Sequence, residues 1–353
     1  MQRVLSIDGG GIRGVLPATW LMSLEELTGR RTADLFDLVV GTSTGGILAL
    51  GLTCPQEDGR SASAAQLRRM YTDHGREIFP GFPSGQPALS AQGHPEPKYP
   101  SAPLERYLQD MFGLTRLSEA LRPAAVVTCD LPTAEPLLFT GGGLDQSELG
   151  DAPMTTAALA TSSFPSYFAP VPFRDPAGRE RSLVDGGVVA RDPAFVGLSY
   201  AVAGVRRSGA ATAVDAAGVA GRTPGHDPQS AEADGDDGVL LVSLGTGTSS
   251  GGLSLEPEAA AELVHTQPRL QLLLPALRAL YGGPGELMRR QLRIALGGRY
   301  VRVQAELPPH VDAALDDARP DNLRGLLDTA EQMVQDGEAE LHRLAALLVQ
   351  PHR

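Results

Sequence analysis

A serine set between two glycines is the first candidate for chemistry in this chain. The segment Gly41-Thr42-Ser43-Thr44-Gly45 fits the pattern G-x-S-x-G. This pattern is typical of a sharp turn between a strand and a helix, where the glycines leave room for neighbouring backbone and the serine is held outward. The N-terminus of the following helix favours the negative charge that develops during acyl transfer. An ordinary glycine turn can have the same sequence, so the flanking strand and helix must distinguish the two interpretations.

A second glycine-rich segment, Asp8-Gly9-Gly10-Gly11-Ile12-Arg13-Gly14, admits three interpretations. The dinucleotide fingerprint G-x-G-x-x-G fits, but it also requires an acidic residue at the end of the second strand, where this chain has Gly41. The phosphate loop of an actin-like sugar kinase would carry Thr or Ser where Ile12 and Arg13 stand. In the third interpretation, backbone N–H groups of the loop stabilise an oxyanion beside Ser43. Only this last interpretation uses both glycine motifs.

A nucleophilic serine needs a base, and the histidines are poor candidates because none lies at the end of a predicted strand. They are His74, His94, His226, His265, His310, His342 and His352. The segment Leu183-Val184-Asp185-Gly186-Gly187 instead places a carboxylate at the end of a short apolar strand, followed by glycines that allow close approach. An Asp-Gly turn is the simpler explanation, but a serine turn without a histidine makes Asp185 a candidate base.

The elements that must position these motifs predict an α/β fold. A strand at 4–7 and a helix at 15–27 flank the first glycine loop, and a strand at 35–40 and a helix at 47–52 flank the serine turn. Strand, glycine turn and helix, repeated twice, indicate a parallel sheet. Further strands are expected at 125–129, 136–140, 183–185, 239–244 and 300–303.

Two segments interrupt this pattern. Residues 80–103, rich in Pro, Gly and Ser, predict a flexible loop or lid, and residues 204–238, rich in Ala, Gly and Asp, predict a flexible insertion. Beyond about Glu256 the pattern becomes helical. The simplest division is a catalytic domain over 1–255 and a helical extension over 256–353 packed on it. The helices expected in the extension span 269–281, 285–296 and 330–349.

The composition limits the partners. The 353 residues include 30 Lys+Arg and 42 Asp+Glu, a net charge of −12, which argues against a nucleic acid polymer and against standing attraction to anionic lipid. Cys54 and Cys129 lack metal-site spacing, so no metal is expected. Neither a signal peptide nor a run of roughly 20 apolar residues is evident. We therefore expect a cytoplasmic protein that contacts membranes only peripherally.

Together, the three motifs resemble the patatin-like phospholipase family in order and spacing. The stretches 160–170 (ATSSFPSYFAP) and 241–247 (LVSLGTG) also resemble that family, and the resemblance covers about residues 2–250. It implies a three-layer α/β/α fold with a mostly parallel central sheet. It also implies a Ser–Asp dyad, lipid acyl hydrolase activity of the phospholipase A type through an acyl-enzyme, and no cofactor.

Carried over residue by residue, the resemblance makes Ser43 the nucleophile and Asp185 the base. The backbone N–H groups of Gly10 and Gly11, with Thr44, would form the oxyanion hole. Arg13 would brace the loop through an ion pair or meet a lipid phosphate. An ordinary aspartate has a pKa of about 3.9, so the base role implies burial that raises it. The supporting motif positions are Gly9, Arg13, Gly14, Gly41, Gly45, Gly186 and Gly187.

The chain departs from the family pattern after Gly187. Val188-Val-Ala-Arg-Asp-Pro193 stands where the family usually has an Asn-rich run, and Asp192 is expected to cap a helix that starts near 194. Segments 79–83 and 270–281 are candidates for contact with a lipid surface, and Trp20 is expected in the core.

Two alternatives to a constitutive hydrolase stay open. One is a nucleotide-binding or non-catalytic protein that uses the first glycine loop. The other rests on bacterial relatives that degrade membranes in antiphage defence when a cyclic nucleotide activates them, so a small-molecule activator is possible. The expected substrate is a phospholipid or another acyl-lipid.

Overall fold

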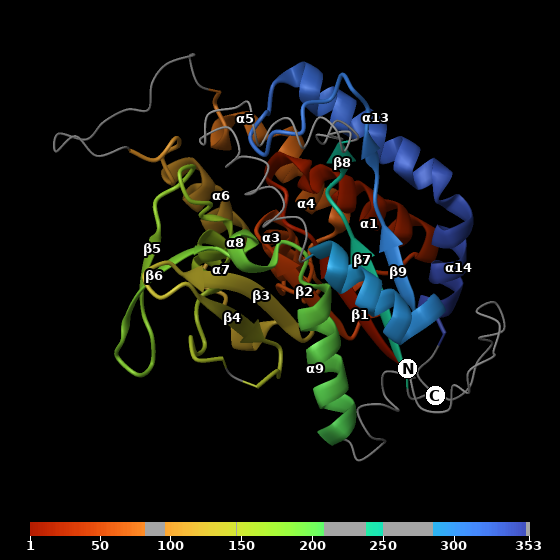
Figure 1. Ribbon diagram of the computed structural model, residues 1–353, viewed down its shortest axis with the longest axis horizontal. Coiled ribbons are helices and arrows are strands. Elements are labelled where there is room, and N and C mark those ends of the chain that lie inside the picture. The colour runs from red at the N-terminus through yellow and green to blue at the C-terminus, as the bar shows by residue number, and fades with distance from the viewer. Residues whose placement is uncertain (82–95, 146, 208–237, 250–284, 351–353) are drawn as a thin grey trace, which may run out of the picture.

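The computed structural model describes residues 1–81, 96–145, 147–207, 238–249 and 285–350. Within these residues the middle layer is an eight-stranded sheet, and helices cover both of its faces (Figure 1). The strands lie across the sheet in the order β5-β6-β3-β2-β1-β7-β9, and β4 also pairs with β3. This arrangement confirms the predicted α/β/α fold.

The sheet is mostly parallel. Parallel pairing joins β1 to β2, β2 to β3, β1 to β7 and β7 to β9, while β4 and β6 pair with β3 antiparallel and β5 pairs antiparallel with β6. The bounds of these strands are β1 Gln2–Ile7, β2 Leu38–Thr42, β3 Ala124–Asp130, β4 Glu135–Gly141, β5 Val171–Arg174, β6 Glu180–Asp185, β7 Val239–Leu244 and β9 Tyr300–Val303. Two short strands, β8 Thr248–Ser249 and β10 Glu306–Leu307, pair with each other.

The named α-helices of the described ranges are α1 Val15–Thr28, α2 Thr32–Leu35, α3 Thr44–Gly51, α4 Ala64–Thr72, α5 Gly75–Ile78, α6 Ala102–Phe112, α7 Met154–Ser162, α8 Gly187–Ala190, α9 Ala194–Arg207, α13 Pro320–Asp336 and α14 Glu338–Leu348. Residues 285–296 are also helical, as expected. The expected helix at 269–281, most of the segments 80–103 and 204–238, and Phe82 lie outside the described residues. No described helix is both long and apolar enough to cross a bilayer.

Side chains alternate between the two faces of the sheet, as the two-residue period of a strand requires. Leu5 and Ile7 of β1 belong to the larger hydrophobic core, together with side chains of α1. Val4 belongs to a second core, together with side chains of α9. The largest side chain of the first core is Trp20, which is buried as predicted. Both faces of β1 are therefore buried, which is typical of a parallel strand covered by helices on both sides.

The register of three neighbouring strands brings the two halves of the site together. Ile7 pairs with Gly41 across β1 and β2, so the loop after Ile7 and the turn after Gly41 leave the sheet side by side. Thr42 pairs with Val127 of β3, and the next residue of β3, Thr128, pairs with Asp185 of β6. A residue at the end of β6 therefore meets the turn that follows β2.

The C-terminal part both extends the sheet and covers it. β9 pairs with β7, and α13 lies beside α1 (Figure 1). The single final helix expected at 330–349 is wrong, because α13 ends at Asp336 and α14 begins at Glu338. A glycine at position 337 interrupts the helix there, while buried side chains continue on both sides at helical spacing, so the apolar period alone does not show the break.

The expected start of the second strand is also wrong. Leu35 closes the short helix α2, and β2 begins only at Leu38. The carboxylate of Glu25 accepts hydrogen bonds from both the backbone N–H and the hydroxyl of Thr32, and this holds the helical turn in place. This contact cannot be predicted from the apolar residues at 35–40.

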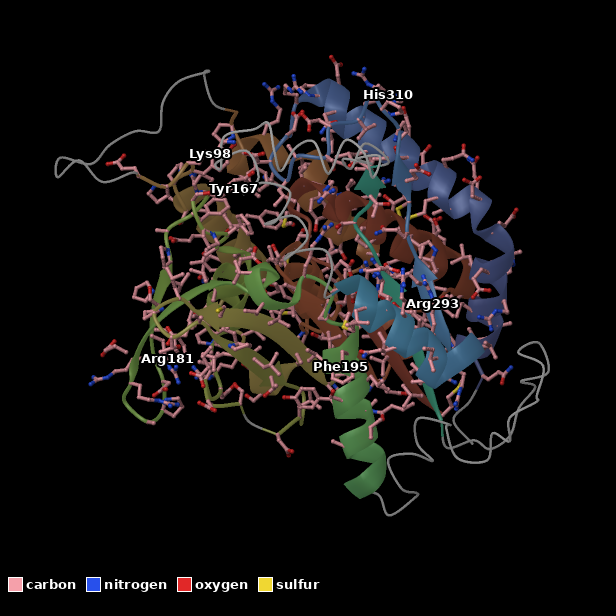
Figure 2. The ribbon with its side chains drawn as sticks, viewed as in Figure 1. Lys98, Tyr167, Arg181, Phe195, Arg293 and His310 are labelled. Carbon is pink, nitrogen blue, oxygen red and sulfur yellow. The ribbon has the colours of Figure 1, made fainter. Side chains whose placement is uncertain are left out.

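Arg181 anchors the strand that carries Asp185. Its guanidinium contacts Asp130 at 3.0 Å, Glu135 at 2.7 Å and Asp175 at 3.3 Å. Figure 2 shows Arg181 on the β5–β6 side of the molecule, well away from the labelled Tyr167. The ion pairs join β3, β4 and β6, so the start of β6 is held against these two strands.

Candidate active site

Ser43 occupies a strained turn between β2 and α3. Its backbone has φ 57° and ψ −127°, a conformation that residues with a side chain rarely adopt. Gly41 and Gly45 make the turn possible: a Cβ at Gly41 would lie 2.1 Å from the carbonyl oxygen of Gly45, and a Cβ at Gly45 would lie 2.2 Å from that of Ile7. The motif therefore builds the sharp turn that the sequence predicts.

Thr161 of α7 stabilises the turn at Ser43. None of the three sequence motifs includes this residue. Its hydroxyl accepts a hydrogen bond from the backbone N–H of Ser43 at 2.8 Å and donates one to the carbonyl of Val127 at 2.6 Å. Thr161 lies within the stretch 160–170 that resembles the family, which is the signal that could have identified it. The contact satisfies a buried donor at the point of strain.

Ser43 and Asp185 meet directly. The hydroxyl of Ser43 donates to Oδ2 of Asp185 at 2.6 Å, and the backbone N–H of Gly187 donates to Oδ1 at 2.6 Å. Burial raises the pKa of Asp185 to about 7, against the two hydrogen bonds, which lower it. Gly186 packs on the carbonyl of Val127, where a Cβ would lie only 2.3 Å from the oxygen.

No described histidine belongs to this site. Among the described ranges, His74 pairs with Glu77, His342 lies 3.9 Å from Glu338, and His310 lies near Gly325 of α13, apart from Tyr167 in Figure 2. The other four, His94, His226, His265 and His352, are outside the described residues.

The glycine loop runs beside Ser43 and is held from both sides. A Cβ at Gly9 would lie 3.2 Å from Cβ of Ser43. The carbonyl of Gly9 accepts from Oγ1 of Thr246 at 2.8 Å and from Nε of Arg191 at 3.0 Å. The backbone N–H groups of Gly10 and Gly11 have no hydrogen-bond acceptor within the described chain. Two unused donors therefore remain in a loop that is itself tightly fixed.

Gly11 requires both its conformation and its lack of a side chain. Its φ is +57°, and a Cβ would lie 2.0 Å from the carbonyl oxygen of Leu315. That same carbonyl accepts the backbone N–H of Ile12 at 2.8 Å. The loop is thus clamped against a segment more than 300 residues further along the chain.

At Thr44 the backbone N–H, and not the hydroxyl, is the group available to an oxyanion. Its hydroxyl shares a hydrogen bond of 2.6 Å with the phenol of Tyr71, in which either oxygen can donate. Gly14 packs beneath this pair, where a Cβ would lie 2.3 Å from the Tyr71 oxygen. The backbone N–H of Thr44 lies in the first turn of α3, where amides have no partner inside the helix.

Arg13 lies behind the glycine loop and does not line the cavity. Its Nε is 3.4 Å from the carbonyl of Gly10, and Nη1 is 3.5 Å from that of Gly247. Within the described residues, Arg13 makes these contacts to carbonyl groups in place of the expected ion pair. Burial, with the positive charge of Arg191, lowers the pKa of Arg13 to about 10.

A buried charge network supports the two segments that carry the site. Arg302 of β9 binds the carboxylate of Asp8, and its Nη1 lies 2.7 Å from the hydroxyl of Ser243 and 3.6 Å from Asp192. Asp192 accepts the backbone N–H of Ala194 at 3.1 Å, which confirms the predicted helix cap. Burial and the nearby Asp8 raise the pKa of Asp192 to about 6. No sequence motif indicated Arg302.

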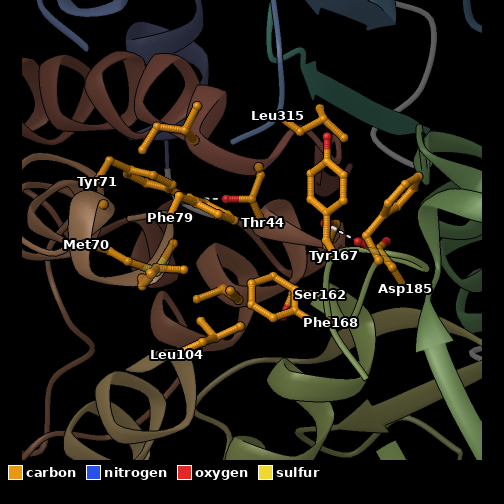
Figure 3. Close-up of a pocket in the computed structure, with 17 residues that line it drawn as sticks. Thr44, Met70, Tyr71, Phe79, Leu104, Ser162, Tyr167, Phe168, Asp185 and Leu315 are labelled. Atoms are coloured by element: carbon orange, nitrogen blue, oxygen red, sulfur yellow. Dashed lines mark hydrogen bonds between the residues drawn. The ribbon is translucent and has the colours of Figure 1, made fainter. Parts of the chain in front are cut away.

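An apolar cavity opens beside Ser43 and Asp185 (Figure 3). Phe79, one of the aromatics expected at a lipid surface, lines this cavity and packs on Tyr99 and Phe168, with ring centroids 5.5 and 6.0 Å away. The other apolar side chains in the wall include Ile12, Ile47, Met70, Ile78, Leu104 and Leu315. An apolar cavity with a few converging polar groups is the usual form of a small-molecule site.

Comparisons with known proteins point to one family. The family model described as patatin-like phospholipase matches residues 5–197. Patatin-17 of Solanum cardiophyllum is 32% identical over 356 residues, covering 96% of this chain and 85% of that protein. "Probable inactive patatin-3-Kuras 1" of Solanum tuberosum is 36% identical and covers 71% of this chain, and this chain spans 63% of it. Patatin-like protein 2 of Oryza sativa subsp. japonica is 39% identical over 56% of this chain and 52% of its own length.

Proposed function

Because the chain belongs to the patatin-like phospholipase family, we propose that it is a serine lipid acyl hydrolase that cleaves fatty-acyl esters of phospholipids or related glycerolipids. The observation that carries the proposal is the 2.6 Å hydrogen bond from Ser43 to Asp185 beside an apolar cavity. One relative is named as inactive, so the proposal rests on the residues of this chain and not on its relatives alone.

In the first step, Oγ of Ser43 attacks the ester carbonyl carbon while its proton passes to Asp185. A base whose pKa lies near 7 is deprotonated in part at neutral pH and can accept this proton. The alcohol, a lysophospholipid, then leaves with the proton held by Asp185, and the acyl group stays on Ser43. In the second step water attacks the acyl-enzyme and gives a proton to Asp185. The bond between the acyl carbon and Oγ of Ser43 then breaks, Asp185 returns the proton to Oγ, and the fatty acid leaves.

The negative charge on the carbonyl oxygen needs donors that are already in place. We assign this role to the backbone N–H groups of Gly10 and Gly11, which have no other acceptor in the described chain, with that of Thr44. Removing one donor of this kind typically costs about 10²- to 10³-fold in kcat. Arg13 then acts by bracing the loop through Gly10.

The cavity wall is apolar on the side of α4, α5 and α6, which suits a fatty-acyl chain. A phospholipid would place its acyl chain there and leave its head group at the mouth, so the enzyme would act on a membrane surface through peripheral contact. A small-molecule activator, such as a cyclic nucleotide, stays a prediction that adding the compound to the same assay would test.

The deciding experiment measures fatty-acid release from mixed phospholipid vesicles by mass spectrometry. Wild type is expected to release fatty acid, whereas Ser43→Ala and Asp185→Asn fall to background while still folded by circular dichroism. Ser199→Ala and Asp328→Asn, at exposed positions of α9 and α13, serve as matched controls and should retain the wild-type rate. Equal release by wild type and both site variants would refute the dyad.

A further inference from the structure

One wall of the cavity comes from the loop between β10 and α13, outside the residues that the family model matches. The side chain of Leu315 in this loop lines the cavity together with Ser43 and Asp185 (Figure 3). The carbonyl of Leu315 accepts the backbone N–H of Ile12, and its atoms leave no room for a side chain at Gly11. Leu315 is therefore placed next to the loop whose amides would hold the reacting carbonyl oxygen.

The neighbouring residue, Asp316, anchors this wall to Lys98, Tyr99 and Tyr167. Its buried carboxylate pairs with Lys98 and accepts the hydroxyl of Tyr99 at 2.7 Å and that of Tyr167 at 3.5 Å. The ammonium group of Lys98 lies 5.2 and 5.1 Å from the two ring centroids, and Figure 2 shows Lys98 and Tyr167 close together. Several contacts on one buried carboxylate make the anchor stiff.

The other end of the loop is held by α13. The side-chain amide of Asn322 accepts the backbone N–H of Asp312 at 2.8 Å and donates to the carbonyl of Asp317 at 2.9 Å. Leu315 thus stands between two fixed points, and its backbone cannot move away from Gly11 without breaking one of them. A bulky group beside the reacting carbonyl would have to share this space.

We propose that Leu315 is a specificity-determining residue that excludes acyl groups branched at the carbon next to the carbonyl, so that the enzyme acts on straight-chain acyl esters. This inference rests on the proposed function. One additional carbon that a pocket cannot accommodate changes kcat/KM by about 10- to 200-fold. Asp316 acts as a positioning residue, because it fixes the wall without lining the cavity itself.

The test compares hydrolysis of p-nitrophenyl dodecanoate with that of p-nitrophenyl 2-methyldodecanoate. Wild type should prefer the straight chain, Leu315→Ala should reduce this preference at least tenfold, and Leu315→Phe should increase it. Asp316→Asn, which keeps Leu315 but weakens its anchor, should reduce the preference in part. Leu327→Ala, a half-buried leucine of α13 that does not line the cavity, is the matched control and should keep the wild-type ratio.

An unchanged ratio in Leu315→Ala, in a protein that is active and folded, would overturn the inference and leave the proposed function standing. If wild type hydrolyses neither ester, the proposed function fails instead. In that case, the affinities of dodecanoic and 2-methyldodecanoic acid are measured by displacement of cis-parinaric acid. This assay tests the role of Leu315 in binding without requiring hydrolysis. The inference holds if Leu315→Ala gains affinity for the branched acid at least tenfold relative to the straight one, and it falls if the ratio of affinities is that of wild type.

Discussion

The guanidinium of Arg302 binds the carboxylate of Asp8 through both terminal nitrogens, with Nη2 2.6 Å from Oδ2 and Nη1 2.9 Å from Oδ1. The two residues are 294 positions apart, and both side chains are buried. Asp8 begins the glycine loop, and Asp192, which also faces Arg302, follows the motif that contains Asp185. One side chain from β9 therefore connects the glycine loop with the segment that follows Asp185.

We expect Arg302→Met to destabilise the protein by about 3–5 kcal/mol, because it leaves Asp8 without its partner in a buried position. Arg302→Lys keeps the charge but cannot bind both carboxylate oxygens, so it should cost less. Urea unfolding of the three proteins measures the difference. Arg324→Met, which removes an exposed pair with Asp321, is the control and should change the free energy of unfolding by no more than about 0.5 kcal/mol. If Arg302→Met changed the free energy of unfolding as little as the control does, the structural role of Arg302 would be contradicted.

The rate of ester hydrolysis should rise with pH through about 7. Only the carboxylate form of Asp185 can take the proton of Ser43, and burial raises its pKa to about 7. Below that pH, kcat/KM should increase about tenfold per pH unit, and above it the profile should level off. A short-chain soluble ester, measured from pH 5 to 9 against Ser43→Ala as background, gives the profile. A flat profile over this range would exclude Asp185 as the titrating base.

Asp185→Asn should make the protein more stable at pH 8 but not at pH 4. The folded protein holds the Asp185 proton up to a pKa of about 7, whereas the unfolded chain releases it near 4. The free energy of unfolding therefore falls as the pH rises between these two values and stays low above them. Asparagine removes this loss, with an upper limit of about 4 kcal/mol.

Melting temperatures of wild type and Asp185→Asn at pH 4 and pH 8 measure this effect. Asp328→Asn, at an exposed position, controls for a general effect of removing one negative charge. Equal differences between wild type and Asp185→Asn at both pH values would show that Asp185 does not titrate as proposed.

Thr161→Val should lower both stability and kcat. The variant keeps the shape of the side chain but leaves the backbone N–H of Ser43 without an acceptor, at a cost of about 1–3 kcal/mol. Thr161→Ser retains the hydroxyl and should recover most of the rate, which a purely steric role would not predict. Thermal unfolding and kcat for one soluble ester, measured on all three proteins, decide between these roles.

Sequence alone was sufficient for features that depend on a few consecutive residues. The turn around Ser43 follows from glycines at fixed offsets, because a Cβ at Gly41 or Gly45 would collide with backbone nearby in the fold. The strands 239–244 and 300–303 were predicted with the bounds observed, since each is a short segment made mostly of apolar residues. Asp185 was recognisable because it ends such a strand before two glycines.

The tertiary structure decided what depends on residues far apart in the chain. Arg302 and Leu315 carry no local signal, since each acts through a partner more than 290 positions away. Thr161 lies in a recognisable stretch, but its contact with Ser43, 118 positions away, appears only in the structure. The pKa of Asp185 likewise depends on burial by several segments and not on its neighbours in sequence. Local sequence thus determined which groups could react, and the packing of segments far apart in the chain decided how they are held.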